Sequence, residues 1–366
     1  MKLGRIKGIL INVHVSTLII VLLVGYSVAI DYYILSGGTA SLLELLIVGL
    51  VNGFAILASI LVHELMHSLV ALRYGLGIHE IELYLFGGVS KIDEEPKSPS
   101  SEVTISIVGP LSSILIGIVF YLFFTFITTG ILAVDLTIYY VGWSNLILGL
   151  FNLVPAFPMD GGRLLRALLW KRRKDHISAT KTAAHIGQGF GYLLMIFGFA
   201  DLFFLGGLFN GIWYIILGMF LNSAAKQSYI SVVYESQLSK FKAGELMREF
   251  TEFITAETPL DKALKEFFIK YKTSFFPVVK EGNVIGIVHI SDVIRIPITS
   301  RAAYPVTKVM RNINDFLSIS PQSTGMDVMK LLTSNQTKPP LVIVKKDDRI
   351  LGYIGQDELD YVLKMV

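Results

Sequence analysis

The chain has 366 residues, of which 53% are hydrophobic and 17% are charged, and its mean hydropathy is +0.61. Soluble proteins carry about 25% charged residues, so this composition excludes an ordinary cytosolic enzyme. A formal net charge of +3 is too small to indicate nucleic-acid binding. Because the chain contains no cysteine, any metal must be held by His and carboxylate side chains.

The charged residues divide the chain into two parts. Residues 1–230 contain 14 Lys or Arg and 13 Asp or Glu, whereas residues 231–366 contain 18 and 16 in a much shorter segment. We therefore expect a membrane domain over residues 1–228, a linker over residues 229–242 and a soluble region after it.

Three stretches, 8–72, 98–162 and 182–225, contain no Lys or Arg. A spanning helix needs about 20 apolar residues, so each stretch has room for two. We predict six membrane-spanning helices, over residues 8–30, 45–71, 103–129, 138–158, 185–205 and 208–225. The competing interpretation of the first helix is a cleaved signal peptide, but its apolar core is too long and no small-residue cleavage site follows it.

The charges between the predicted helices indicate their orientation. Basic residues lie before the first pair and between the pairs, whereas the turns within the pairs carry only acidic charge, as at Asp31, Asp135 and Asp201. The positive-inside rule then predicts a multi-pass protein of the cell membrane with both termini in the cytoplasm.

The second predicted helix contains a His-Glu-x-x-His motif formed by His63, Glu64 and His67. Two His residues four apart lie on one helix face, which is the spacing needed to hold one zinc ion, and Glu64 beside them can accept a proton from water. Each ionisable group in hydrocarbon costs about 2.5–3.5 kcal/mol on insertion scales. The alternative, two packed core histidines, has no interaction to offset that cost.

Residues Ile81–Val89 alternate in polarity and contain Gly87-Gly88. The pattern predicts a β-hairpin that ends in a Gly-Gly turn. An ordinary surface hairpin would give the same pattern.

The fourth predicted helix ends in a second motif, from Asn152 through Pro155 and Pro158 to Asp160. The two prolines break the helix, and broken backbone is tolerated in a membrane only where protein buries it or water fills a cavity. Asp160 is therefore a candidate third metal ligand. The alternative is that Asp160 caps the next helix and Asn152 forms a hydrogen bond between helices.

Together the two motifs resemble the site-2 protease family of intramembrane zinc metalloproteases. The resemblance implies that His63, His67 and Asp160 hold one Zn²⁺, and that Glu64 is the catalytic base. It also implies that Asn152 holds substrate or the oxyanion.

The same resemblance implies a hairpin that approaches the active site and pairs with unwound substrate. His14 matches a His that is common in the prokaryotic, archaeal-like branch of this family, but we assign it no role.

Residues 243–296 and 306–362 read as two copies of one unit, each with two buried strands and a closing helix. They resemble a tandem pair of cystathionine-β-synthase (CBS) domains, over residues 243–298 and 304–366. The expected fold class is thus a polytopic α-helical membrane domain followed by an α/β CBS pair.

The CBS family often binds adenine nucleotides, through a strand Gly, a Thr or Ser three residues later and an Asp six residues later. The first repeat has Gly286, His289 and Asp292, so the hydroxyl is missing but the ribose-binding Asp is present. Asp292 is therefore the candidate nucleotide-binding residue. The second repeat has Gly352, Gly355 and Glu358, and departs at both later positions.

The CBS pair could instead be a dimerisation or docking module.

The pattern as a whole predicts hydrolysis of a peptide bond in or near a transmembrane segment of a membrane-protein substrate. It also predicts modulation by the CBS pair and a homodimer, with no nucleic-acid partner. The rival hypotheses are a CBS-regulated divalent-metal transporter and a non-catalytic binding protein. Transport gives no reason for a general base between the two His residues.

Overall fold

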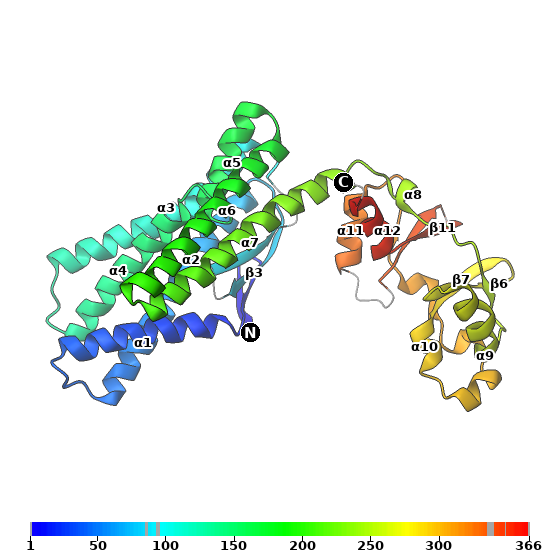
Figure 1. Ribbon diagram of the computed structural model, residues 1–366, viewed down its shortest axis with the longest axis horizontal. Helices are drawn as coiled ribbons and strands as arrows, with labels where there is room; N and C mark the ends of the chain where they lie inside the picture. Colours follow the sequence, from blue (N-terminus) through cyan, green and yellow to red (C-terminus); the bar gives the residue numbers. More distant parts are fainter. Residues whose placement is uncertain (1, 85–86, 93–95, 335–339, 348, 365–366) are drawn as a thin grey trace. The chain divides into compact units, whose positions relative to one another are not determined.

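The structure is a computed structural model that describes residues 2–84, 87–92, 96–334, 340–347 and 349–364. The chain forms two compact units, Met1–Ile230 and Ser231–Val366 (Figure 1).

Long apolar helices form most of the first unit and run side by side (Figure 1). In the described part of the chain, six helices are long and apolar enough to cross a membrane. They are α1 (Thr17–Leu35), α2 (Leu42–Arg73), α3 (Pro99–Phe126), α4 (Leu132–Asn152), α6 (His176–Ala200, continued by a π-helical turn at Asp201–Leu205) and α7 (Leu208–Leu238). The predicted membrane fold with six spans is confirmed. A further helix, α5 (Asp160–Arg173), has 14 residues and is too short to span.

The first predicted helix begins too early. Residues 8–16 do not continue α1, because Lys2–Ile6 and Ile9–Val13 form strands β1 and β2. The positive φ angles of Lys7 and Gly8 make the turn between them. Ile9 and Ile11 are buried on one face of β2, so the apolar residues that suggested a helix form the buried face of a strand.

Strand β2 belongs to a four-stranded sheet with the order β1-β2-β3-β4. Strand β3 (Ile78–Tyr84) pairs parallel with β2 and antiparallel with β4 (Gly87–Ile92). The sequence pattern placed Gly87 and Gly88 in the turn of the hairpin. In the structure they pair with Tyr84 and Leu83, so they lie in β4 instead. Residues 85–86, which connect β3 to β4 in the sequence, lie outside the described residues.

Polar side chains join the helices of the first unit. Asn52 on α2 donates to the Thr137 hydroxyl on α4 at 3.0 Å, and Asn145 on α4 donates to Ser59 on α2 at 2.8 Å. Hydrogen bonds of this kind hold membrane helices together where no hydrophobic driving force exists between them. They join α2, which carries the His-Glu-x-x-His motif, to α4.

The second unit contains two sheets with similar connections. The strands of the first sheet, in the order β5-β6-β7-β8, are Ile254–Thr255, Phe275–Lys280, Asn283–His289 and Arg311–Asn312. Those of the second, in the order β11-β10-β9, are β9 (Ser318–Ile319), β10 (Val342–Lys346) and β11 (Arg349–Ile354). The helices are α8 (Ala243–Leu246), α9 (Leu260–Ala263, continued by a π-helical segment at Leu264–Ile269), α10 (Ile290–Ile294), α11 (Gly325–Ser334) and α12 (Gln356–Lys364), with 3₁₀ turns at Ile298–Ala303, Val306–Lys308 and Ile313–Asp315.

The two repeats exchange their opening segments. Arg311, at the start of the second repeat, pairs with Ile287 in β7 of the first. Arg248, at the start of the first repeat, pairs with Tyr353 in β11 of the second. Each sheet is thus completed by the other repeat, so the two repeats form one folded unit.

Candidate metal centre

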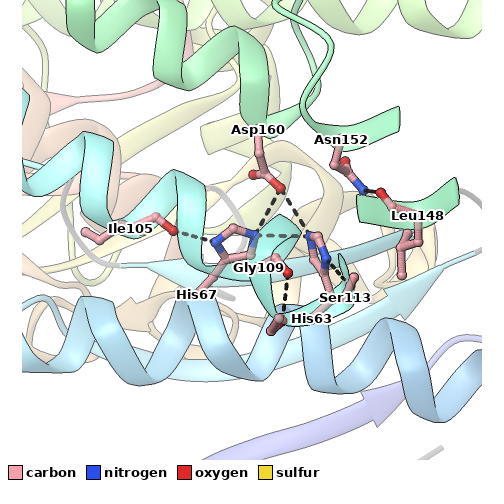
Figure 2. Close-up of polar contacts among 9 residues, drawn as sticks. His63, His67, Ile105, Gly109, Ser113, Leu148, Asn152 and Asp160 are labelled. Carbon is pink, nitrogen blue, oxygen red and sulfur yellow. Dashed lines mark hydrogen bonds and ion pairs between the residues drawn. The ribbon is translucent and has the colours of Figure 1, made fainter. Parts of the chain in front are cut away.

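The two His residues of the motif lie one turn apart on α2 and point to the same side (Figure 2). His63 is 3% exposed and His67 is 6% exposed, and their Nε2 atoms are 3.2 Å apart. Two basic nitrogens so close together, out of solvent, call for a cation or a proton between them.

Asp160 reaches this pair from the first turn of α5. Its Oδ2 lies 3.1 Å from Nε2 of His63 and 3.0 Å from Nε2 of His67 (Figure 2). Asp160 can reach the two His residues because Gly161 and Gly162, which follow it, let the start of α5 pack closely on the backbone before it. A Cβ at Gly161 would lie 2.5 Å from the carbonyl carbon of Leu153, and one at Gly162 would lie 2.5 Å from that of Ala156. Only glycine fits at either position.

Helix α3 holds both imidazole rings by their far nitrogens. Nδ1 of His67 lies 2.6 Å from the Ile105 carbonyl, and Nδ1 of His63 lies 3.0 Å from the Ser113 hydroxyl (Figure 2). A carbonyl only accepts, so His67 carries its proton on Nδ1, and Nε2 of the neutral ring keeps its lone pair. Contacts of this kind fix the tautomer and orientation of metal-binding histidines.

Gly109 on α3 lies directly against the ring of His67. A Cβ there would meet Nε2 and would lie 2.6 Å from Cε1. The sequence pattern did not predict that Ile105, Gly109 and Ser113 lie at the site. Their signal was a Gly-Pro pair followed by serines inside an apolar stretch, at Gly109-Pro110 and Ser112-Ser113.

The three side chains fit a catalytic zinc ion. A tetrahedral zinc ion with bonds of about 2.0–2.2 Å separates its ligand atoms by about 3.3–3.5 Å. The three atoms here are 3.0–3.2 Å apart and form the one group of three or more metal-ligating side chains found in the described residues. Three protein ligands leave a fourth position open for water or substrate.

Glu64 lies next to His63 on α2 and is partly buried beneath strand β4. The backbone of Gly88 packs on its side chain so closely that a Cβ there would lie 2.7 Å from Cδ of Glu64. The edge strand of the described sheet therefore lies beside the carboxylate that the sequence assigns as the base.

Asn152 is the last residue of α4 and is not one of the three clustered residues. Its Nδ2 donates to the Leu148 carbonyl at 2.9 Å (Figure 2). The amide nitrogen carries a second N–H, which it can donate to an oxyanion without leaving this bond. His14 is exposed, and its Nδ1 lies 2.9 Å from the Ser16 hydroxyl.

In the second unit, the candidate Asp292 and its counterpart in the other repeat, Glu358, form matching ion pairs. Asp292 lies 3.8 Å from Nε of Arg311 and 3.4 Å from Nη1 of Arg295. Glu358 lies 4.0 Å from Nη1 of Arg248, beside a pocket of 770 Å³. His289 is the last residue of β7 and stands at the position of the missing hydroxyl. Burial lowers the pKa of His289 below its ordinary value, although the negative charge of Asp292 opposes this effect.

Comparison with known proteins identifies the family of the chain. The family described as "Peptidase family M50" matches residues 52–136 and 129–198, and the CBS domain family matches residues 243–298. A zinc metalloprotease of Methanocaldococcus jannaschii is 34% identical over 293 residues, which are 80% of this chain and 78% of that protein. The chain belongs to peptidase family M50.

Two further proteins to which this M50 peptidase is similar have related names. A protein of Mycobacterium tuberculosis named as a zinc metalloprotease, Rip3, is 30% identical over 332 residues, covering 87% of this chain and 82% of its own. The solved site-2 protease from Methanocaldococcus jannaschii is 34% identical, with a TM-score of 0.44, and covers 63% of this chain and 94% of that one.

The predicted family, enzyme class and CBS domain are therefore confirmed. This M50 peptidase is a multi-pass membrane metallopeptidase, and zinc is the metal of its family.

Proposed function

We propose that this M50 peptidase hydrolyses a peptide bond in or near a transmembrane segment of a membrane protein, using one zinc ion held by His63, His67 and Asp160. The observation that carries the proposal is the cluster of two imidazoles and a carboxylate, 3.0–3.2 Å apart, with both imidazoles on a helix long enough to span a membrane. Buried ionisable groups at such depth are costly and mark function.

A zinc ion held by His63, His67 and Asp160 would act as a Lewis acid toward the peptide carbonyl and would lower the pKa of water toward about 7. Glu64 accepts the proton of the attacking water and then delivers it to the leaving amine. Asn152 donates the N–H of its amide that does not bond to the Leu148 carbonyl to the oxyanion as it forms.

The substrate is unwound when it is cut, because the amides of a helix are hydrogen-bonded and shielded. Strand β4 lies at the edge of the described sheet and against Glu64. An extended substrate segment can therefore add to β4 as a further strand, which aligns its backbone beside the base.

The test is cleavage of a test membrane substrate in proteoliposomes by the wild type and by Glu64→Gln. The variant should keep its zinc, since Glu64 is not a ligand, and should lose cleavage. Cleavage by a zinc-loaded Glu64→Gln protein at the wild-type rate would contradict the assigned role of Glu64.

We also propose that the CBS pair, over residues 243–298 and 304–366, binds an adenine nucleotide with Asp292 at the ribose. It would thereby modulate the protease, and it would pair two chains in a homodimer. Asp292 is close to two Arg side chains that can neutralise phosphate charge. Calorimetry of the full chain with ATP, ADP and AMP should give heat that Asp292→Ala abolishes, and no heat with any of them contradicts the proposal.

The proposed orientation, with both termini in the cytoplasm of a cell-membrane protein, can be tested by labelling. The chain has no cysteine, so single cysteines placed at either end are the sole reactive thiols. Labelling of intact cells by a membrane-impermeant reagent at either end would contradict this orientation.

A further inference from the structure

A buried ion pair in the membrane unit is not part of either recognised motif. Glu102 on α3 is 0% exposed and Arg166 on α5 is 4% exposed. Nε of Arg166 donates to Oε1 of Glu102 at 2.6 Å, and Nη2 of Arg166 pairs with the same oxygen. Desolvation of two charges usually cancels their attraction, so such a pair is weak evidence for a contribution to stability alone.

The acidic partner lies on the helix that holds both His ligands. Glu102 is one turn before Ile105, whose carbonyl receives the Nδ1 proton of His67. Further along α3, Ser113 contacts Nδ1 of His63. Helix α3 therefore fixes the positions of the two imidazoles.

The basic partner lies on the helix that carries Asp160. Arg166 is less than two turns after Asp160 on α5, and its guanidinium lies over the ring of Phe157 at 5.4 Å from the centroid. Phe157 is buried in the loop just before Asp160. Arg166 thus contacts the chain before Asp160 and belongs to the helix after it.

We propose that the Glu102–Arg166 pair is a positioning pair that sets Asp160 against the two His residues. The pair fastens α5, which carries the carboxylate ligand, to α3, which orients the imidazoles. The inference rests on the proposed ligation of zinc by Asp160. Neither residue is one of the three proposed ligands, so both act through the ligand positions.

The test measures zinc affinity of the full-length protein in detergent, by competition with a chelator. Single substitutions leave an unpaired buried charge, so the informative variant is Glu102→Leu with Arg166→Met, which replaces the pair by apolar side chains of similar size. Loss of an outer contact to a ligand typically lowers metal affinity about 10–100-fold, and we expect a loss in that range. Thr137→Val, which removes the Asn52–Thr137 hydrogen bond in the same unit, should leave zinc affinity unchanged.

Thermal unfolding of each zinc-free variant separates positioning from folding. The proposal requires weakened zinc binding in a double variant that unfolds near the wild-type temperature, and wild-type zinc affinity in that variant overturns it. If the double variant does not fold, Arg166→Lys decides. This substitution keeps the charge but loses the planar fork, so it should also weaken zinc binding, and unchanged affinity overturns the proposal.

The ligand assignment is tested separately with Asp160→Asn. If this variant binds zinc as tightly as the wild type, Asp160 is not a ligand and the proposed function fails at that residue. If Asp160→Asn loses affinity and the pair variants do not, only the positioning role fails.

Discussion

Replacement of Gly88 by Ala tests whether strand β4 controls the base. The added Cβ would lie 2.7 Å from Cδ of Glu64, closer still to its Cγ, and 3.1 Å from Cδ2 of Leu83. Carbon atoms pack at about 3.5–4.0 Å, so the Glu64 side chain must move by about 1 Å. Gly88 has no left-handed backbone angle, so the effect is steric.

A displacement of about 1 Å in a catalytic group costs about 100-fold in rate, which corresponds to about 2.7 kcal/mol in the activation free energy. We therefore expect Gly88→Ala to lower kcat about 100-fold in proteoliposomes and to keep the wild-type zinc content, because Glu64 is not a ligand.

Gly189→Ala is the matched control, since a Cβ on Gly189 in α6 meets no atom within 4 Å. It should cleave at the wild-type rate. A Gly88→Ala protein as active as this control would refute the argument that β4 fixes Glu64.

Three further predictions concern other parts of the molecule. Gly109→Ala should weaken zinc binding at least tenfold in chelator competition, because its Cβ displaces the His67 ring, and wild-type affinity would show that the ring moves freely. Asn152→Ala should lower kcat about 10²–10³-fold with little change in KM, as expected for loss of an oxyanion donor, whereas an effect on KM alone would indicate a role in substrate binding. Burial lowers the pKa of His289 from 6.5, so this residue stabilises the fold above pH 6.5 and the contribution is lost as the pH falls through the lowered value. Thermal unfolding at pH 7.5 and pH 5 should therefore show a smaller loss of stability on acidification in His289→Gln than in the wild type, and equal losses would contradict this.

The sequence predicted the clustered residues because their constraints are local. His63 and His67 share a helix face by spacing alone, and Asp160 follows a break that prolines and glycines encode. Few polar groups are tolerated in such apolar stretches, so those present indicate the site.

What the sequence did not predict depends on contacts between distant segments. Residues 9–13 are as apolar as a helix start, and they form a strand because β3, far along the chain, pairs with them. The contact of Gly109 with His67 and the Glu102–Arg166 pair join different helices, and no periodicity encodes such contacts. The exchange of opening segments between the CBS repeats is likewise a tertiary feature.

X-ray absorption at the zinc edge tests the central claim most directly. Purified wild-type protein should contain one zinc ion per chain, with two imidazole nitrogens and a carboxylate oxygen at about 2.0–2.2 Å. In Asp160→Ala the carboxylate contribution should disappear while the two imidazoles remain. An unchanged spectrum in Asp160→Ala, or a zinc site without imidazole ligands in the wild type, would contradict the account.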